Sequence, residues 1–88
     1  MNEKKFRRMY ENILQGNARN INFEDLCDFV VDLGFRMARQ KGTSHRIYTM
    51  DEIPDIINLQ EGKDGKAKPY QIDQIKKIIR KYKLGGKE

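Results

Sequence analysis

The fold is decided by residues 35–50, which read FRMARQKGTSHRIYTM. In the first part of this stretch, apolar Phe35 and Met37 alternate with residues of the opposite face, which is the period-two pattern of a half-buried β-strand. The composition of residues 41–44 predicts a short turn, and residues 45–50 predict a second strand. Because so short a connection joins antiparallel neighbours, the stretch predicts a β-hairpin.

A third strand is expected after the hairpin. Asp51, Glu52 and Pro54 interrupt the apolar pattern, and residues 56–60 predict a short strand that follows them. The sequence therefore predicts a three-stranded antiparallel sheet.

The second strand has two faces, and either one could meet the core. Residues 45, 47 and 49 share one face, while residues 46, 48 and 50 share the other. Because the burial of Arg46 is costly, we expect Ile47 to face the helices. His45 then lies on the same side, at the rim of the strand.

Amphipathic helices flank the strands on both sides. Apolar residues recur at the spacing of one helix face, which predicts helices over residues 3–15, 23–33 and 69–83. Asn2 and Asn22 suit the N-cap positions of the first two helices, and Pro69 suits the first turn of the third. Cys27 lies on an apolar stripe, so we interpret it as a small hydrophobic residue rather than a reactive thiol.

The order of these elements predicts an α+β domain in two layers, with a three-stranded antiparallel sheet packed on two helices. The first helix is extra to this unit. We therefore divide the chain into an N-terminal helical extension, residues 1–20, and a domain, residues 21–88. The apolar face of the extra helix must be buried on this domain or on another chain, and the second alternative predicts a homodimer through the N-terminal helix.

The composition limits the classes of protein to which the chain can belong. Its 88 residues make one small domain, and no apolar run approaches the roughly 20 residues that a transmembrane helix needs. The first residues lack the apolar stretch of a secretory signal. The single cysteine excludes a disulfide scaffold and favours a reducing, cytoplasmic location.

The net charge and the absence of certain motifs limit the classes of partner and cofactor that the chain can bind. A net charge of +5 favours a polyanion such as nucleic acid, with an acidic protein as the alternative. One histidine and one cysteine cannot build a zinc site, and the chain has no glycine-rich dinucleotide motif, so we expect no cofactor and no metal.

The single histidine is the first candidate for chemistry. His45 opens the predicted second strand, and an imidazole can take and return a proton near neutral pH. Cations, hydroxyl groups and a glycine that permits close backbone approach lie near it in the sequence and could hold a phosphate: Arg39, Lys41, Gly42, Thr43, Ser44 and Arg46. The alternative is a solvated hairpin turn with a polar residue at the end of a strand.

A basic segment before the last helix is the second candidate. The free N–H groups and the dipole at the start of that helix favour an anion near Pro69. We expect phosphate contacts from Lys63, Lys66 and Lys68 in this segment and from Lys76 in the helix. A solvated loop and a solvated helix face are the alternatives.

Three stretches together resemble a known family. Residues 34–35, 39–48 and 66–72 read GF, RQKGTSHRIY and KAKPYQI, and they are similar to the HicA toxins of bacterial type II toxin–antitoxin systems. The resemblance covers about residues 21–84. Its most specific part is the glycine–hydroxyl–histidine signature at the start of the central strand.

The resemblance implies a fold, an activity and a partner. The fold is the α-β-β-β-α fold of double-stranded-RNA-binding domains, the activity is that of a ribosome-independent mRNA interferase, and the partner is a HicB-like antitoxin. The family's catalytic histidine falls on His45, its glycine on Gly42 and its hydroxyl position on Thr43 and Ser44. Two features differ from the common family form: two hydroxyl residues separate the glycine from the histidine, and about 20 further residues precede the second helix.

Three functional hypotheses follow. The first is a toxin that is a metal-independent endoribonuclease, cleaves mRNA and uses His45 as its general base. The second is a non-catalytic module of the same fold that binds double-stranded RNA through phosphate and 2′-OH contacts. The third is a protein-interaction domain whose basic surface meets an acidic partner.

Overall fold

The computed structural model describes residues 1–41 and 45–86, with residues 39–41 described by their backbone alone. The elements follow one another as α1 (Glu3–Leu14), α2 (Phe23–Leu33), β1 (Arg36–Lys41), β2 (His45–Met50), β3 (Ile53–Gln60) and α3 (Pro69–Tyr82). Of the four expected turn residues, Lys41 is instead the last residue of β1, and Gly42, Thr43 and Ser44 lie outside the described residues.

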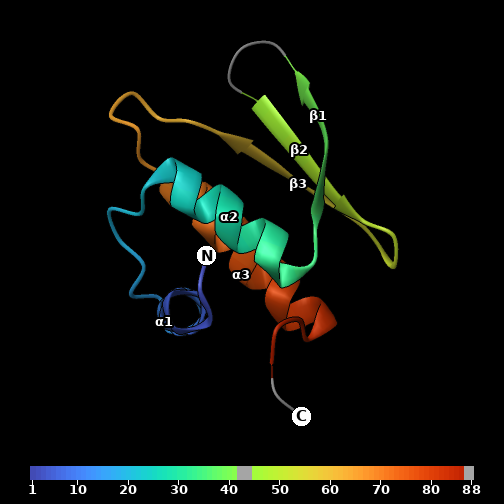
Figure 1. Cartoon of the computed structure of the whole chain (residues 1–88), viewed down its shortest axis with the longest axis horizontal. Helices are drawn as coiled ribbons and strands as arrows, with labels where there is room; N and C mark the ends of the chain where they lie inside the picture. Colours follow the sequence, from blue (N-terminus) through green and yellow to red (C-terminus); the bar gives the residue numbers. More distant parts are fainter. Residues whose placement is uncertain (42–44, 87–88) are drawn as a thin grey trace.

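The strands form one antiparallel sheet in the order β1-β2-β3. Lys41 pairs with His45 in the first ladder, and His45 pairs with Gln60 in the second. In Figure 1, α2 and α3 run side by side on one side of this sheet, and its other face is open. The predicted α+β architecture in two layers, with antiparallel pairing throughout, is confirmed.

The third strand is longer than expected. It begins at Ile53 rather than at residue 56, and Pro54 lies inside it. Proline donates no hydrogen bond to a ladder, but β3 is an edge strand, where one row of N–H groups is not needed for pairing. Burial explains the early start, since Ile53 and Ile57 both lie in the core.

The helices begin where the asparagine caps predict. The Asn2 side chain accepts a hydrogen bond from the Lys5 N–H (2.7 Å), and the Asn22 side chain accepts one from the Asp25 N–H (3.2 Å). Gly34 ends α2 with a φ of 126°, which disfavours any residue that has a Cβ. Within residues 1–41 and 45–86, no helix has the length and apolarity that a membrane span requires.

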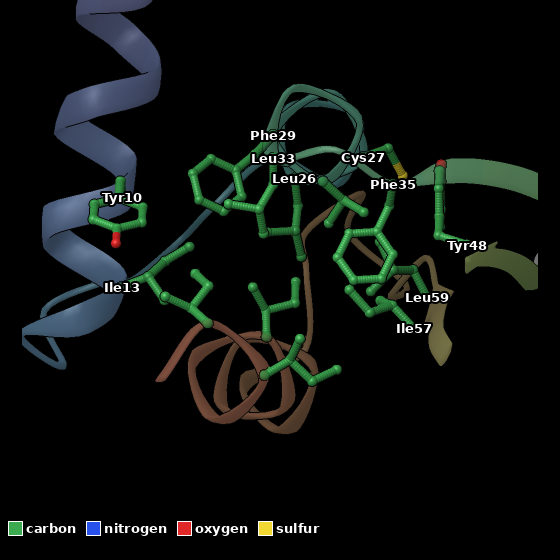
Figure 2. Close-up of a cluster of buried hydrophobic side chains, with 14 of the residues drawn as sticks. Tyr10, Ile13, Leu26, Cys27, Phe29, Leu33, Phe35, Tyr48, Ile57 and Leu59 are labelled. Atoms are coloured by element: carbon green, nitrogen blue, oxygen red, sulfur yellow. The ribbon is translucent and has the colours of Figure 1, made fainter. Parts of the chain in front are cut away.

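The first helix packs on the rest of its own chain. Tyr10 and Ile13 of α1 belong to the same buried cluster as the apolar residues of α2 and α3 (Figure 2). Phe6 stacks on Phe29 at a centroid distance of 4.9 Å, and the Tyr10 hydroxyl donates to the Leu84 carbonyl at 2.7 Å. The apolar face of α1 is therefore buried within the chain, and it needs no second copy to cover it.

The prediction for the inner face of β2 is wrong. Tyr48 is only 3% exposed and packs into the core, whereas Ile47 is partly exposed. Arg46 lies on the Tyr48 face and contacts Glu24 of α2, because its guanidinium reaches the rim of the layer, where the side chain stays 25% exposed. The cost of burying a charge is thus largely avoided, and His45 lies on the open face of the sheet.

Met37 is also more exposed than the sequence pattern predicts. It was expected on the half-buried face of the first strand, but it is 50% exposed. Met37 pairs with Tyr48 and therefore lies on the inner face of the sheet, but β1 is an edge strand and this face is less covered there. Cys27, by contrast, is buried, as its place on the apolar stripe predicts.

Candidate active site

His45 is the first residue of β2 and lies at one end of the open face of the sheet. Its side chain is partly exposed, so a ligand on this face can reach it. The Nδ1 atom lies 3.3 Å from Oδ1 of Asn58, an exposed residue of β3. Asn58 is the register partner of Ile47, which puts it diagonally across from His45 on the same face.

Two of the predicted cations lie beside His45 in the first ladder. Lys41 pairs directly with His45, and Arg39 pairs with Ile47. The backbone of β1 therefore brings both residues next to the histidine. Three more of the six predicted neighbours, Gly42, Thr43 and Ser44, lie outside the described residues.

Arg46 is not brought together with His45, although it is adjacent in sequence. Its two terminal nitrogens donate to the two carboxylate oxygens of Glu24 at 3.0 and 2.9 Å. The guanidinium also lies 5.2 Å from the centroid of the Phe23 ring. This bidentate pair ties the start of β2 to α2 on the face opposite the histidine.

The pair shifts the ionisation of both partners. Hydrogen bonding to Arg46 lowers the pKa of the Glu24 carboxyl, and the same bond raises the pKa of the guanidinium. Both groups are held in their charged forms. Arg46 is therefore already neutralised by a carboxylate and lies away from the surface on which a substrate would meet His45.

Cys27 and Tyr48 complete the polar group beneath β2. Arg46 Nη1 lies 3.5 Å from Cys27 Sγ, and Tyr48 extends from the sheet toward Cys27 (Figure 2). Burial raises the pKa of the Cys27 thiol, and burial raises the pKa of Tyr48 to about 12. Both groups stay protonated near neutral pH, and a protonated thiol is a poor nucleophile.

The basic segment lies at the same end of the sheet as His45. It leaves β3 at Gln60, which pairs with His45, and it carries Lys63, Lys66 and Lys68 into α3. These lysines line an open surface hollow together with Asn20, Gly62, Asp64, Ala67 and Pro69. The structure therefore brings three of the four predicted lysines to the histidine's end of the molecule.

This segment is fastened to the start of α2. The Phe23 N–H donates to the Gly65 carbonyl at 2.9 Å, and the Ala67 N–H donates to the Ile21 carbonyl at 2.8 Å. Within the segment, the Asp64 side chain accepts a hydrogen bond from the Lys66 N–H at 3.1 Å. These hydrogen bonds fix the backbone of the segment, while its lysine side chains stay at the surface.

The start of α3 carries Pro69 in its first turn and has no side-chain cap among the described residues. Gln71 in this turn is fully buried and donates from Nε2 to the Gln60 carbonyl at 2.9 Å, while its Oε1 has no hydrogen-bond partner in the described part of the chain. The burial of Gln71 was not predicted from the sequence. Its position four residues before Ile75, on the apolar stripe, is the signal that could have found it.

Lys76 is the predicted lysine that lies elsewhere. It faces α1, where it lines a surface hollow with Ile13, Gly16 and Ile72. The structure does not bring it together with His45. Asn58, on the same face as His45, was not predicted from the sequence. The alternation of β3 could have indicated it, because Asn58 lies between two buried residues, Ile57 and Leu59.

The described residues contain no group of three or more histidine, cysteine or acidic side chains that could hold a metal ion. Comparison with known proteins leaves the site to be judged on its own geometry, because no family model, curated protein or solved structure matches this chain.

Proposed function

We propose that this protein is a metal-independent endoribonuclease with His45 as its general base. In this proposal the domain has the fold of double-stranded-RNA-binding domains and acts as an mRNA-cleaving toxin of the HicA kind. The observation that carries the proposal is the position of a partly exposed His45 on an open sheet face, beside the backbone of Lys41 and at the end of the sheet from which a lysine-rich segment leaves.

The reaction needs one proton acceptor and stabilised negative charge. His45 takes the proton of a ribose 2′-OH, and the 2′ oxygen attacks the adjacent phosphorus. The bond from phosphorus to the 5′ oxygen breaks, which leaves a 2′,3′-cyclic phosphate and a 5′-hydroxyl. The departing oxygen takes a proton from water or from the imidazolium just formed.

Cations near the reacting phosphate stabilise the charge that builds up on it. We assign this role to Lys41 and Arg39, since they pair with His45 and Ile47 in the first ladder. Arg46 takes no part in the proposal, because Glu24 already neutralises it on the opposite face.

Phosphates that flank the cleaved bond need a second set of contacts. Lys63, Lys66 and Lys68 are suited to hold them, because they surround a hollow that leads to the start of α3. Binding through such contacts weakens as the salt concentration rises. Lys76 is not included, since it faces α1.

A toxin requires a means of restraint in its own cell. We propose an acidic, HicB-like antitoxin that covers the face on which His45 lies. The support is the net charge of +5, which favours an acidic partner as well as RNA.

The substitution His45→Gln tests the proposed chemistry. Purified wild-type protein should cleave a single-stranded mRNA in the presence of EDTA, and the products should carry 2′,3′-cyclic phosphate ends. The variant should cleave at least about 100-fold more slowly, which is the usual contribution of a general base. Thr49→Val, on the same face of β2, is the matched control and should keep the wild-type rate. Equal cleavage by His45→Gln and wild type would refute the proposal.

The lysine-rich segment favours a second candidate, a non-catalytic module that binds double-stranded RNA. The three lysines and the start of α3 can hold phosphates without any proton transfer. This candidate predicts salt-dependent binding of a long RNA duplex, unchanged by His45→Gln and without cleavage. Gel-shift and cleavage assays on the same protein samples separate the two functions.

A further inference from the structure

We infer that Asn58 is the positioning residue of this site: its side-chain oxygen selects the tautomer of His45 that keeps the proton on Nδ1 and leaves Nε2 free to accept one. This inference rests on the proposed ribonuclease activity. It concerns which ring nitrogen does the chemistry and what holds that nitrogen toward the substrate.

The argument begins with the contact between the two side chains. His45 Nδ1 lies 3.3 Å from Asn58 Oδ1. With Oδ1 rather than the amide nitrogen of Asn58 facing the ring, Nδ1 is the donor, because an amide oxygen only accepts hydrogen bonds. A neutral imidazole carries a single N–H, and therefore its lone pair lies on Nε2, the nitrogen on the far side of the ring from Asn58.

The backbone on either side of Asn58 is held in place by the core. Its neighbours Ile57 and Leu59 are both fully buried, so β3 cannot shift without exposing core residues. Asn58 pairs with Ile47, two residues along both strands from the pairing of His45 with Gln60, so Asn58 lies on the same face as His45. A partner on a rigid strand orients a catalytic group better than one on a loop.

A second constraint acts on the backbone of His45 from the opposite face. Arg46, the next residue, is bound by both oxygens of Glu24 on α2. The strand is therefore anchored immediately after the histidine, while the ring itself is held only through Asn58 among the contacts described for it. Loss of Asn58 should free the ring to rotate and to exchange tautomers, and should leave the strand in place.

A residue that orients the ring is needed because the chain has a single histidine. The chain has one histidine, so the same ring must meet the 2′-OH in the correct tautomer at each turnover. In enzymes that use a histidine base, a third group commonly fixes the tautomer and the orientation of the ring. Asn58 is in position to do this for His45.

The experiment is imidazole nitrogen NMR on the full chain, labelled with ¹⁵N, at a pH where the ring is neutral. With a single histidine, the two ring nitrogens are observed without overlap from other residues. In the wild type, Nδ1 should resonate as a protonated nitrogen and Nε2 as an unprotonated one. Asn58→Leu, which removes the acceptor at similar volume, should move the two signals toward each other or exchange them.

The same variants are then assayed for RNA cleavage. Asn58→Leu should lower kcat about 3- to 10-fold, the worth of one hydrogen bond, and leave KM nearly unchanged. Asn58→Asp keeps an acceptor in the same place, so it should restore the wild-type tautomer and most of kcat, although its added negative charge raises KM. Thr49→Val should match the wild type in both measurements, and thermal melts confirm that each variant is folded.

The outcomes separate this inference from the proposed function. Wild-type tautomer signals in Asn58→Leu, or an unchanged kcat despite altered signals, would overturn the role of Asn58 while the ribonuclease stands. A wild-type protein that does not cleave RNA refutes the proposed function, and the catalytic role of Asn58 falls with it even when the NMR signals follow the expected pattern.

Discussion

The two faces of β2 differ in how they use polar residues. On the inner face, Arg46 and Tyr48 are bound to groups of α2 and have shifted pKa values. On the open face, His45 is partly exposed, and the contact described for it is with Asn58. Shifted pKa values often indicate a functional site, but here they arise where the strand is attached to a helix. The candidate for chemistry lies on the other face of the same strand.

The largest expected effect tests whether the inner face of β2 supports the fold and the open face does not. Tyr48→Ala should lower the free energy of unfolding by about 3–5 kcal/mol, because it leaves a cavity beneath the sheet. Ile47→Ala, one residue away on the open face, should lower it by about 1 kcal/mol or less. Urea unfolding followed by circular dichroism measures both. Equal losses would mean that the open face is covered by something in solution.

The burial of Tyr48 on the inner face should make the stability of the protein fall at alkaline pH. Tyr48 has a pKa of about 12 in the folded protein against 10.0 ordinarily, so the folded state holds this proton more tightly than the unfolded state does. Its contribution is complete below pH 10 and is lost as the pH rises through about 12, with a total of about 2–3 kcal/mol. Tyr48→Phe should remove this part of the alkaline loss in urea unfolding. The same pH dependence in both proteins would assign the loss to other groups.

The smallest effects should separate the charge of the inner face from the charge of the lysine-rich segment. Lys66→Gln should reduce the slope of log K for RNA binding against log salt by about 0.7–0.9 and leave stability unchanged. Arg46→Gln should lower stability by about 1 kcal/mol, the value of a partly exposed ion pair, and leave the salt slope as it is. Fluorescence anisotropy with a labelled RNA gives the slopes. A smaller salt slope for Arg46→Gln than for the wild type would mean that Arg46 contacts the RNA.

Much of the fold follows from local patterns in the sequence. The caps Asn2 and Asn22, the apolar stripes of the helices and the antiparallel pairing of the first two strands depend on residues close in sequence, and these predictions are confirmed. The start of β3 was wrong because Pro54 was taken as a break, although an edge strand tolerates it. The burial of Met37 was overestimated because alternation shows which face a residue lies on but not that its strand lies at the edge of the sheet.

The candidate site is less accessible to sequence analysis because its contacts are distant in sequence. His45 and Asn58 are 13 residues apart, and Arg46 and Glu24 are 22 apart. No rule of spacing indicates that Arg46 pairs with a carboxylate of α2, so the free-energy cost of burying Arg46 was overestimated. The nearness of the lysine-rich segment to His45 depends in turn on the register of β2 and β3.

The hydrogen bond from Tyr10 to Leu84 has a consequence for synthesis of the chain. The two residues are 74 positions apart, so α1 leaves the ribosome long before the carbonyl that its tyrosine binds. Until then the stripe that includes Tyr10 and Ile13 has no completed surface to cover it. Exposed apolar surface of this kind invites aggregation or a chaperone during translation. The helix that comes first in the sequence is therefore among the last parts of the molecule to be secured.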